Sequence, residues 1–193
     1  SINAPIQYSY TLVDGEKYLS SLALLPSWLF SPREGQQTAI SLRFQSKDFL
    51  QPALTDSENR DATEFAGGVS WFWIIAEQKG YLNAKYEYNH EAARGNNWSY
   101  AGHRAGVNAL YPVGDRWKFQ AGIEAYQQSF DNVNTVFLEK RQDRTMTYNA
   151  EARYDLSETI DVLLQCVSIA TDSSVTVYEF SKYTIGIGVN ARF

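Results

Sequence analysis

The last twelve residues, KYTIGIGVNARF (Lys182–Phe193), decide the fold of this chain because they alternate without a break. The apolar positions are Tyr183, Ile185, Ile187, Val189, Ala191 and Phe193, and small, polar or charged residues stand between them. Side chains of a β-strand point to opposite faces in turn, whereas a helix repeats every three to four residues. The period of two therefore predicts a strand with one apolar face and one polar face.

The same period recurs upstream, and no helical spacing competes with it. Clear alternation covers residues 40–45, 82–89, 104–111, 116–125 and 146–155. Less regular segments fill the remaining places at Ile6–Val13, Tyr18 to about Phe30, Glu64–Ala76 and Thr159–Ala170. With the last segment these make ten strands. Pro26 makes the second segment irregular, because proline lacks the N–H that a sheet interior uses. No shift in composition divides the chain, so we predict one domain over residues 1–193.

The links between these segments alternate in length. Tight links cover residues 77–80, 112–115 and 155–158, and longer ones cover 47–61, 90–98, 131–141 and 171–176. The first two links fit less well, since 14–17 is short where a long loop is due and 31–37 exceeds a minimal turn. Bacterial outer-membrane barrels combine short periplasmic turns, longer extracellular loops and an even strand number. We therefore predict an all-β fold: a complete, closed, antiparallel up-and-down transmembrane β-barrel of about ten strands.

The two faces of the predicted strands differ in chemistry. The apolar face is rich in Ala, Val, Tyr and Trp, whereas a soluble barrel would need large, interlocking core side chains. We therefore predict that this face contacts lipid and that the polar face lines a lumen. The predicted lumen-lining residues are Arg43, Glu64, Lys85, Glu87, Arg104, Lys118, Glu124, Glu151, Arg153, Asp161, Lys182 and Arg192. Their charges nearly balance, as a buried set requires. The alternative is a soluble sheet whose charged face is solvated.

Aromatic residues reach 15% of the chain. Tyrosine and tryptophan are favoured where apolar material meets water, as at a membrane interface. We predict two girdles: Tyr111, Trp117 and Tyr154 at the short-turn rim, and Tyr88, Trp98, Tyr100 and Tyr178 at the long-loop rim.

Several function classes are disfavoured. A net charge of −5 leaves no basic stripe for nucleic acid. The single cysteine, Cys166, has apolar neighbours and is predicted to be a small buried filler. The two histidines form no HExxH spacing, and no G-x-S-x-G is present, so we predict no metal, no cofactor and no enzyme activity. A less favoured alternative is an enzyme at the long-loop rim that uses His90, His103, Asp131 and Asp143.

Two resemblances extend this reading. The segment YTIGIGVNARF (Tyr183–Phe193) resembles the terminal-strand signal that the barrel assembly machinery reads in outer-membrane proteins. Segments 86–107, 138–156 and 171–193 resemble the C-terminal barrel of tetratricopeptide-repeat outer-membrane proteins, a group similar to the surface lipoprotein assembly modifiers. There, R-x-D opens one strand (Arg141–Asp143 here) and D-S-x-V-x-x-Y precedes the last (Asp172–Tyr178 here). This chain departs from the group because it has no repeat region. The resemblance implies the bacterial outer membrane as the location.

The predicted function is a narrow channel, or a translocation or anchor barrel, with a charged lumen, since about ten strands leave little interior. A structural partner subunit of a larger outer-membrane complex is the alternative. The expected partners are outer-membrane lipid, the barrel assembly machinery and a periplasmic or membrane protein, but not nucleic acid.

Overall fold

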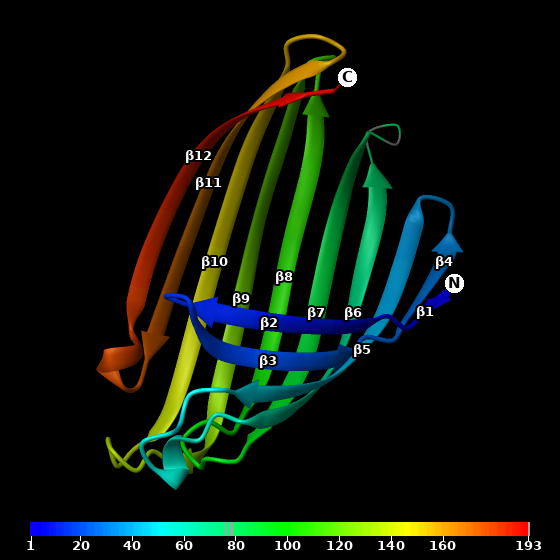
Figure 1. The fold of residues 1–193 in the computed structure, drawn as a ribbon. Coiled ribbons are helices and arrows are strands. Elements are labelled where there is room, and N and C mark those ends of the chain that lie inside the picture. The colour runs from blue at the N-terminus through cyan, green and yellow to red at the C-terminus, as the bar shows by residue number, and fades with distance from the viewer. Residues whose placement is uncertain (76, 78, 193) are drawn as a thin grey trace.

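The computed structural model describes residues 1–75, 77 and 79–192 and confirms an all-β, antiparallel up-and-down fold (Figure 1). The described residues form one sheet of twelve strands: β1 (Ile2–Asn3), β2 (Ile6–Val13), β3 (Glu16–Leu24), β4 (Ser27–Arg33), β5 (Gln36–Phe49), β6 (Ala62–Ile75), β7 (Gly80–Ala93), β8 (Tyr100–Val113), β9 (Trp117–Val133), β10 (Lys140–Asp155), β11 (Ile160–Ser173) and β12 (Phe180–Ala191). Two single 3-10 turns, η1 (Asp56–Glu58) and η2 (Thr176–Tyr178), lie in loops. No described helix has the length and apolarity to cross a membrane.

Twelve strands occupy ten positions across the sheet, because two positions are each divided near a proline. Leu24 of β3 pairs with Phe44 of β5, and Ser27 of β4 pairs with Ser41 of β5. The step is three residues forward from β3 to β4 and three residues back along β5, as an antiparallel register without a break requires. The register of β3 on β5 therefore continues into β4. The backbone N–H of Leu42 donates to the Pro26 carbonyl at 2.8 Å and bridges the gap.

The first position of the sheet is divided in the same way. Ile6 of β2 pairs with Leu24, and Ile2 of β1 pairs with Trp28 in the same register. Leu25 N–H donates to the Pro5 carbonyl at 3.0 Å between them. The expected ten segments thus correspond to ten positions, and the strand count is twelve because proline cannot donate to the ladder.

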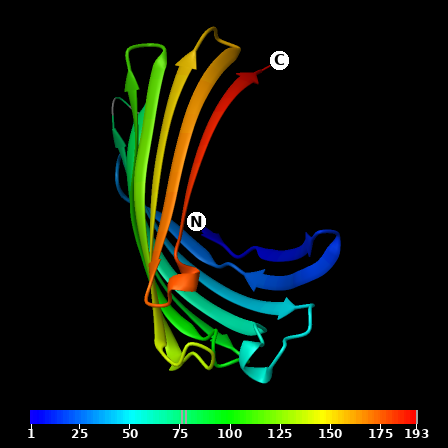
Figure 2. The same ribbon diagram turned by 90° about the vertical axis from the view of Figure 1, so that its left-hand side faces the viewer.

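The sheet curls into a deep trough (Figure 2). From β5 to β12 every strand pairs with the next along the chain, and β1 and β2 form the opposite edge. Among the described strands, β12 pairs only with β11, so no backbone hydrogen bonds join the two edges. The expected closure of the sheet is therefore not part of the observed hydrogen-bond pattern.

Short and long links lie at opposite ends of the strands from β4 onward (Figure 1), whereas the turn 14–15 between β2 and β3 is short although it lies at the long-loop end, as the sequence predicted. The long loops cover residues 50–61, 94–99, 134–139 and 174–179, and the tight turns include 34–35, 114–116 and 156–159. The expected longer link at 31–37 is wrong, because Gly35 adopts φ 71° and closes a two-residue turn. The tight link expected at 77–80 includes Gln78, which lies outside the described residues, as does Ala76.

The pairing registers define two faces. We call inner the face that carries Arg43, Glu64 and Glu124, where Glu64, Asn89 and Ala66 are buried, and outer the opposite face. The outer face is apolar and exposed, reaching 78% exposure at Ile187, whereas Glu64 on the inner face is buried. Cys166 is exposed on the outer face, so its prediction as a buried filler is wrong. Its apolar neighbours belong to an exposed surface rather than to a core.

Candidate functional site

The inner face of the sheet carries all twelve residues that the sequence assigned to the polar side. Direct cross-strand partners share a face, and the chain of registers from β5 to β12 places them together. Eleven of the twelve form ion pairs with described side chains. Lys182 on β12 forms none with the described residues.

Glu64 is the centre of the largest group of charges. It accepts from Arg43 Nη2 at 2.8 Å and lies 2.7 Å from Lys47 Nζ. Arg43 also donates to Glu87 at 3.1 Å, and Lys47 donates to Glu91 at 2.7 Å. Two cations from β5 are thus held by three carboxylates from β6 and β7. Since an unpaired buried charge is costly, each member depends on the others.

Neutral hydrogen-bonding groups extend this network toward β8 and β9. The Asn89 amide donates to Glu64 at 3.4 Å, and its oxygen accepts from the Tyr126 hydroxyl at 3.1 Å. The Tyr100 hydroxyl donates to Glu91 at 3.3 Å. Asn89 is only 2% exposed, so its polar atoms depend on these partners.

A second set of contacts joins β7, β8 and β9 on the inner face, further from the long loops than Glu64. Glu124 lies 3.0 Å from Arg104 and also pairs with Lys85. The Arg104 guanidinium lies 4.2 Å from the Tyr126 ring centroid, in a cation–π contact. The network from Arg43 to Glu124 therefore crosses five adjacent strands.

A separate cluster lies near the tight turns. Asp161 accepts from Asn190 at 2.8 Å and from Arg192 at 2.9 Å, which ties the start of β11 to the end of β12. Arg153 pairs with Glu151 at 2.9 Å, and Lys118 pairs with Asp155 at 2.9 Å.

The long-loop end carries a third cluster, which we call the loop-end cluster: Trp98, Phe130, Arg141, Asp143, Ser173 and Tyr178. Arg141 donates twice to the buried Asp143, through Nε at 2.9 Å and through Nη2. Its guanidinium carbon lies 3.4 Å from the Tyr178 ring centroid and 4.3 Å from that of Phe130. Ser173 donates to Asp143 at 2.7 Å. The two motifs that carry the second resemblance, R-x-D and D-S-x-V-x-x-Y, therefore meet in space.

Of the aromatic residues predicted for two girdles, those at the short-turn rim lie on the outer face, and most of those at the long-loop rim do not. Trp117 stacks on Phe119 at 5.6 Å and contacts Tyr154 at 4.7 Å, all on the outer face near the tight turns. At the long-loop rim, Tyr88 lies on the outer face beside its cross-strand partner His103, but Trp98, Tyr100 and Tyr178 do not form an outer girdle. Their polar groups or rings find partners at the inner side and in the loops, including Glu91, Glu58 and Arg141.

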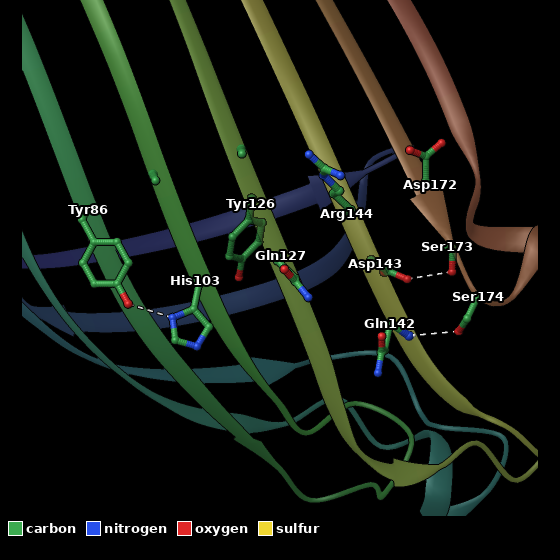
Figure 3. A pocket seen from close by; sticks show the side chains of 12 residues that line it. Tyr86, His103, Tyr126, Gln127, Gln142, Asp143, Arg144, Asp172, Ser173 and Ser174 are labelled. Carbon is green, nitrogen blue, oxygen red and sulfur yellow. Dashed lines mark hydrogen bonds between the residues drawn. The ribbon is translucent and has the colours of Figure 1, made fainter.

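The outer face changes from apolar to polar at one level on β8 to β11. His103, Gln127, Arg144 and Asp172 are successive cross-strand partners there, around a hollow of about 540 Å³ (Figure 3). The His103 Nδ1 lies 2.8 Å from the Tyr86 hydroxyl. The exposed Arg144 forms no ion pair with a described side chain.

The residues considered for a rim enzyme make three separate contacts, although His103 and Asp143 both line the hollow of Figure 3. His90 Nε2 lies 3.3 Å from Asp131, whereas His103 contacts Tyr86 and Asp143 is occupied by Arg141. Within the described part of the chain, no three His, Cys, Asp or Glu side chains are grouped as a metal ion would need.

Sequence reasoning missed several members of these clusters. Lys47 and Glu91 continue the inner-face alternation of Arg43 and Glu87, but both were predicted to lie in the loops 47–61 and 90–98. The strands β5 and β7 extend further toward the long loops than the sequence predicted, to Phe49 and Ala93. Arg141 and Asp143 were visible only as a motif, because their partners come from hairpins distant in the sequence.

The inner face offers paired charges and hydrogen-bonding groups. Its ion pairs balance: Arg43, Lys47, Lys85 and Arg104 face Glu64, Glu87, Glu91 and Glu124. Such a surface suits water, small polar solutes or structural support. Comparison of the chain with known protein families, curated proteins and solved structures finds no match.

Proposed function

We propose that the chain is an integral β-barrel of a bacterial outer membrane, with a narrow polar interior that serves as a conduit or anchor. The observation that carries this proposal is the exposed apolar band on the outer face. Within this band the outward side chains of β8 to β12 carry no charge, whereas the inner face carries charges of which most are paired, which is the reverse of a soluble sheet around an apolar core.

The height of the apolar band fits a membrane. On each strand from β8 to β12, the outward residues are apolar, aromatic or small over nine residues: 105–113, 117–125, 146–154, 162–170 and 183–191. Nine residues span about 26 Å along a strand, or roughly 20 Å across a bilayer at a tilt near 40°. Outer-membrane barrels carry an apolar band of roughly 25 Å. The row from His103 to Asp172 would lie at its polar boundary.

The directions of the two edge strands, and the faces on which their side chains lie, support closure of the sheet in the membrane. With ten positions of alternating direction, β12 and β1–β2 run antiparallel. Both alternate in the same sense: Ile185 and Ile187 point outward on β12, as do Tyr8 and Tyr10 on β2. Exposed edges do not persist in hydrocarbon, so we propose that these edges pair there.

The exposed apolar residues of β12 also support a partner during assembly. Tyr183, Ile185, Ile187 and Val189 are 67–78% exposed on an unpaired edge strand. We propose that the barrel assembly machinery reads this strand. Phe193, the last residue of the expected signal, lies outside the described residues.

Insertion is tested first with the intact chain. We expect the protein to require detergent and to migrate differently on gels before and after boiling, as closed barrels do. A chain that is monodisperse without detergent would overturn the membrane proposal.

Closure is tested by thiol cross-linking in lipid vesicles. Ile185→Cys in the native background should cross-link to Cys166, because the two positions are cross-strand partners. This pair is the positive control. In a Cys166→Ser background, Ile185→Cys is combined in turn with Tyr8→Cys, Tyr10→Cys or Leu12→Cys on the opposite edge. If the control pair links and none of the three test pairs does, the edges do not meet.

A second candidate, a structural partner subunit, is favoured by the balance of ion pairs on the inner face, which leaves few charges free for transport. Planar-bilayer recordings separate the two. Discrete conductance steps support the conduit. The absence of such steps, both in the wild type and in variants whose long loops have lost their contacts with one another, supports the structural partner subunit.

A further inference from the structure

We propose that the loop-end cluster is a latch, in which the Arg141 guanidinium holds the long loops together as a cap over one end of the inner face. The latch itself is independent of the membrane proposal. Its role in closing a conduit rests on the proposed function.

Arg141 is held on several sides at once. Asp143, with its side chain 3% exposed, accepts two hydrogen bonds from it, and Tyr178 stacks on it at 3.4 Å. Phe130 contributes a second ring at 4.3 Å, and Trp98 a third at 5.9 Å. These residues come from three different hairpins: the loop after β7, strands β9 and β10, and the loop after β11. One planar cation therefore joins loops that are not neighbours in the sequence.

The position of the latch is on the inner side. Phe130, Asp143 and Ser173 belong to the inner face by register, and Tyr178 and Trp98 reach them from loops. Trp98 and Tyr178 contact each other at 6.4 Å, and Phe137 of the intervening loop contacts Tyr178 at 6.0 Å. The loops therefore gather over the end of the sheet rather than splay outward.

A second set of contacts adds the first long loop to the cap. Glu58 accepts from the Asn97 amide and from the Trp98 indole N–H at 3.1 Å. Asn97, which is 3% exposed, also donates to Thr135 at 2.9 Å. Arg60 lies 4.0 Å from the Trp98 ring. All four long loops are thus connected through Trp98, Asn97 and Tyr178.

Backbone packing supports a fixed arrangement. Gly95 N–H donates to the Asn59 carbonyl at 2.8 Å, and Asn97 N–H donates to the Ser57 carbonyl at 3.2 Å. A Cβ atom at Gly95 would lie 2.5 Å from both the Asn59 and Ser57 carbonyl oxygens. The loop after β7 and the loop after β5 therefore fit without space for a side chain.

The latch is tested by hydrogen exchange on the full chain in detergent. Arg141→Lys keeps the charge but loses the planar stack, and Tyr178→Ala removes the stacking ring. We expect backbone exchange in loops 94–99 and 174–179 to become about tenfold faster in both. Matched controls are Arg144→Lys, on the same strand but exposed on the outer face, and Tyr183→Ala, an outward tyrosine on β12. Neither control should change exchange in these loops.

The same proteins are then recorded in planar bilayers, where we expect both latch variants to be open about tenfold more often than the wild type. Loop exchange equal to the wild type in Arg141→Lys and Tyr178→Ala, with boiling-dependent gel migration retained, overturns the latch. Faster exchange with an unchanged open fraction overturns its closing role. Faster exchange with no conductance in any protein supports the latch and removes the conduit from the proposed function.

Discussion

Glu64 and Lys47 are joined by a 2.7 Å ion pair between β6 and β5, and the Glu64 side chain is only 5% exposed. The same carboxylate binds Arg43, so one buried anion serves two cations. Removing it leaves both cations facing the inner side with one remaining partner each, Glu91 and Glu87.

Glu64→Ala is therefore expected to destabilise the fold by about 2 to 3 kcal/mol, below the roughly 3 to 5 kcal/mol of an isolated buried pair, because Arg43 and Lys47 each keep a second carboxylate partner. Glu64→Gln should cost less, because the amide oxygen still accepts a hydrogen bond. Urea unfolding followed by tryptophan fluorescence measures both. The control is Glu158→Ala, an exposed turn residue without an ion pair to the described side chains. Equal effects of Glu64→Ala and Glu158→Ala would contradict the role of Glu64.

The outer band makes a prediction specific to lipid. Ile123→Lys places a charge near the middle of the band on β9 and should destabilise the vesicle-inserted protein by about 2 to 4 kcal/mol. Gln127→Lys, on the same face of the same strand but beyond the band, should stay within about 0.5 kcal/mol. The folded fraction on unboiled gels across a urea series reports the difference. If both variants behave like the wild type, Ile123 does not face lipid.

A close approach on the inner face explains why β8 carries glycine at position 102. A Cβ atom there would collide with the Asn89 side-chain oxygen and with the Tyr126 ring. Because Asn89 is held by Glu64 and Tyr126, Gly102→Ala should cost about 1 to 3 kcal/mol. The control is Gly186→Ala on β12, where a Cβ atom meets nothing within 4 Å. Thermal unfolding by circular dichroism compares the two, and a neutral Gly102→Ala would show that Asn89 can shift.

Asp161 holds the end of the last strand through Asn190 and Arg192. Asp161→Ala should free that end, so that amide exchange of residues 186–192 becomes faster while residues 180–185 change little. Asp172→Ala, at the opposite end of β11 and exposed on the outer face, is the matched control. Mass-resolved hydrogen exchange measures both, and equal protection of residues 186–192 in both proteins would exclude this role for Asp161.

The strand positions were predictable because alternation is local. Residues 117–125 and 146–154 alternate in the sequence, and the same residues form the outer band of β9 and β10. The extensions of β5 and β7 to Phe49 and Ala93 were not predictable, because the C-terminal end of each strand carries a charged residue on the inner side, Lys47 or Glu91, and resembles a loop in composition. The ion pair of Lys47 with Glu91 becomes visible only when the two strands are placed two positions apart.

By itself, the sequence determined the all-β fold, the ten strand positions and the chemistry of each face, since a period of two assigns every side chain to one side of a strand. Tertiary structure decided which charges meet, where Pro5 and Pro26 divide the strands, and that Trp98, Arg141 and Tyr178 converge. The physical reason is range: alternation depends on adjacent residues, whereas ion pairs and loop contacts depend on how the curved sheet brings distant hairpins together.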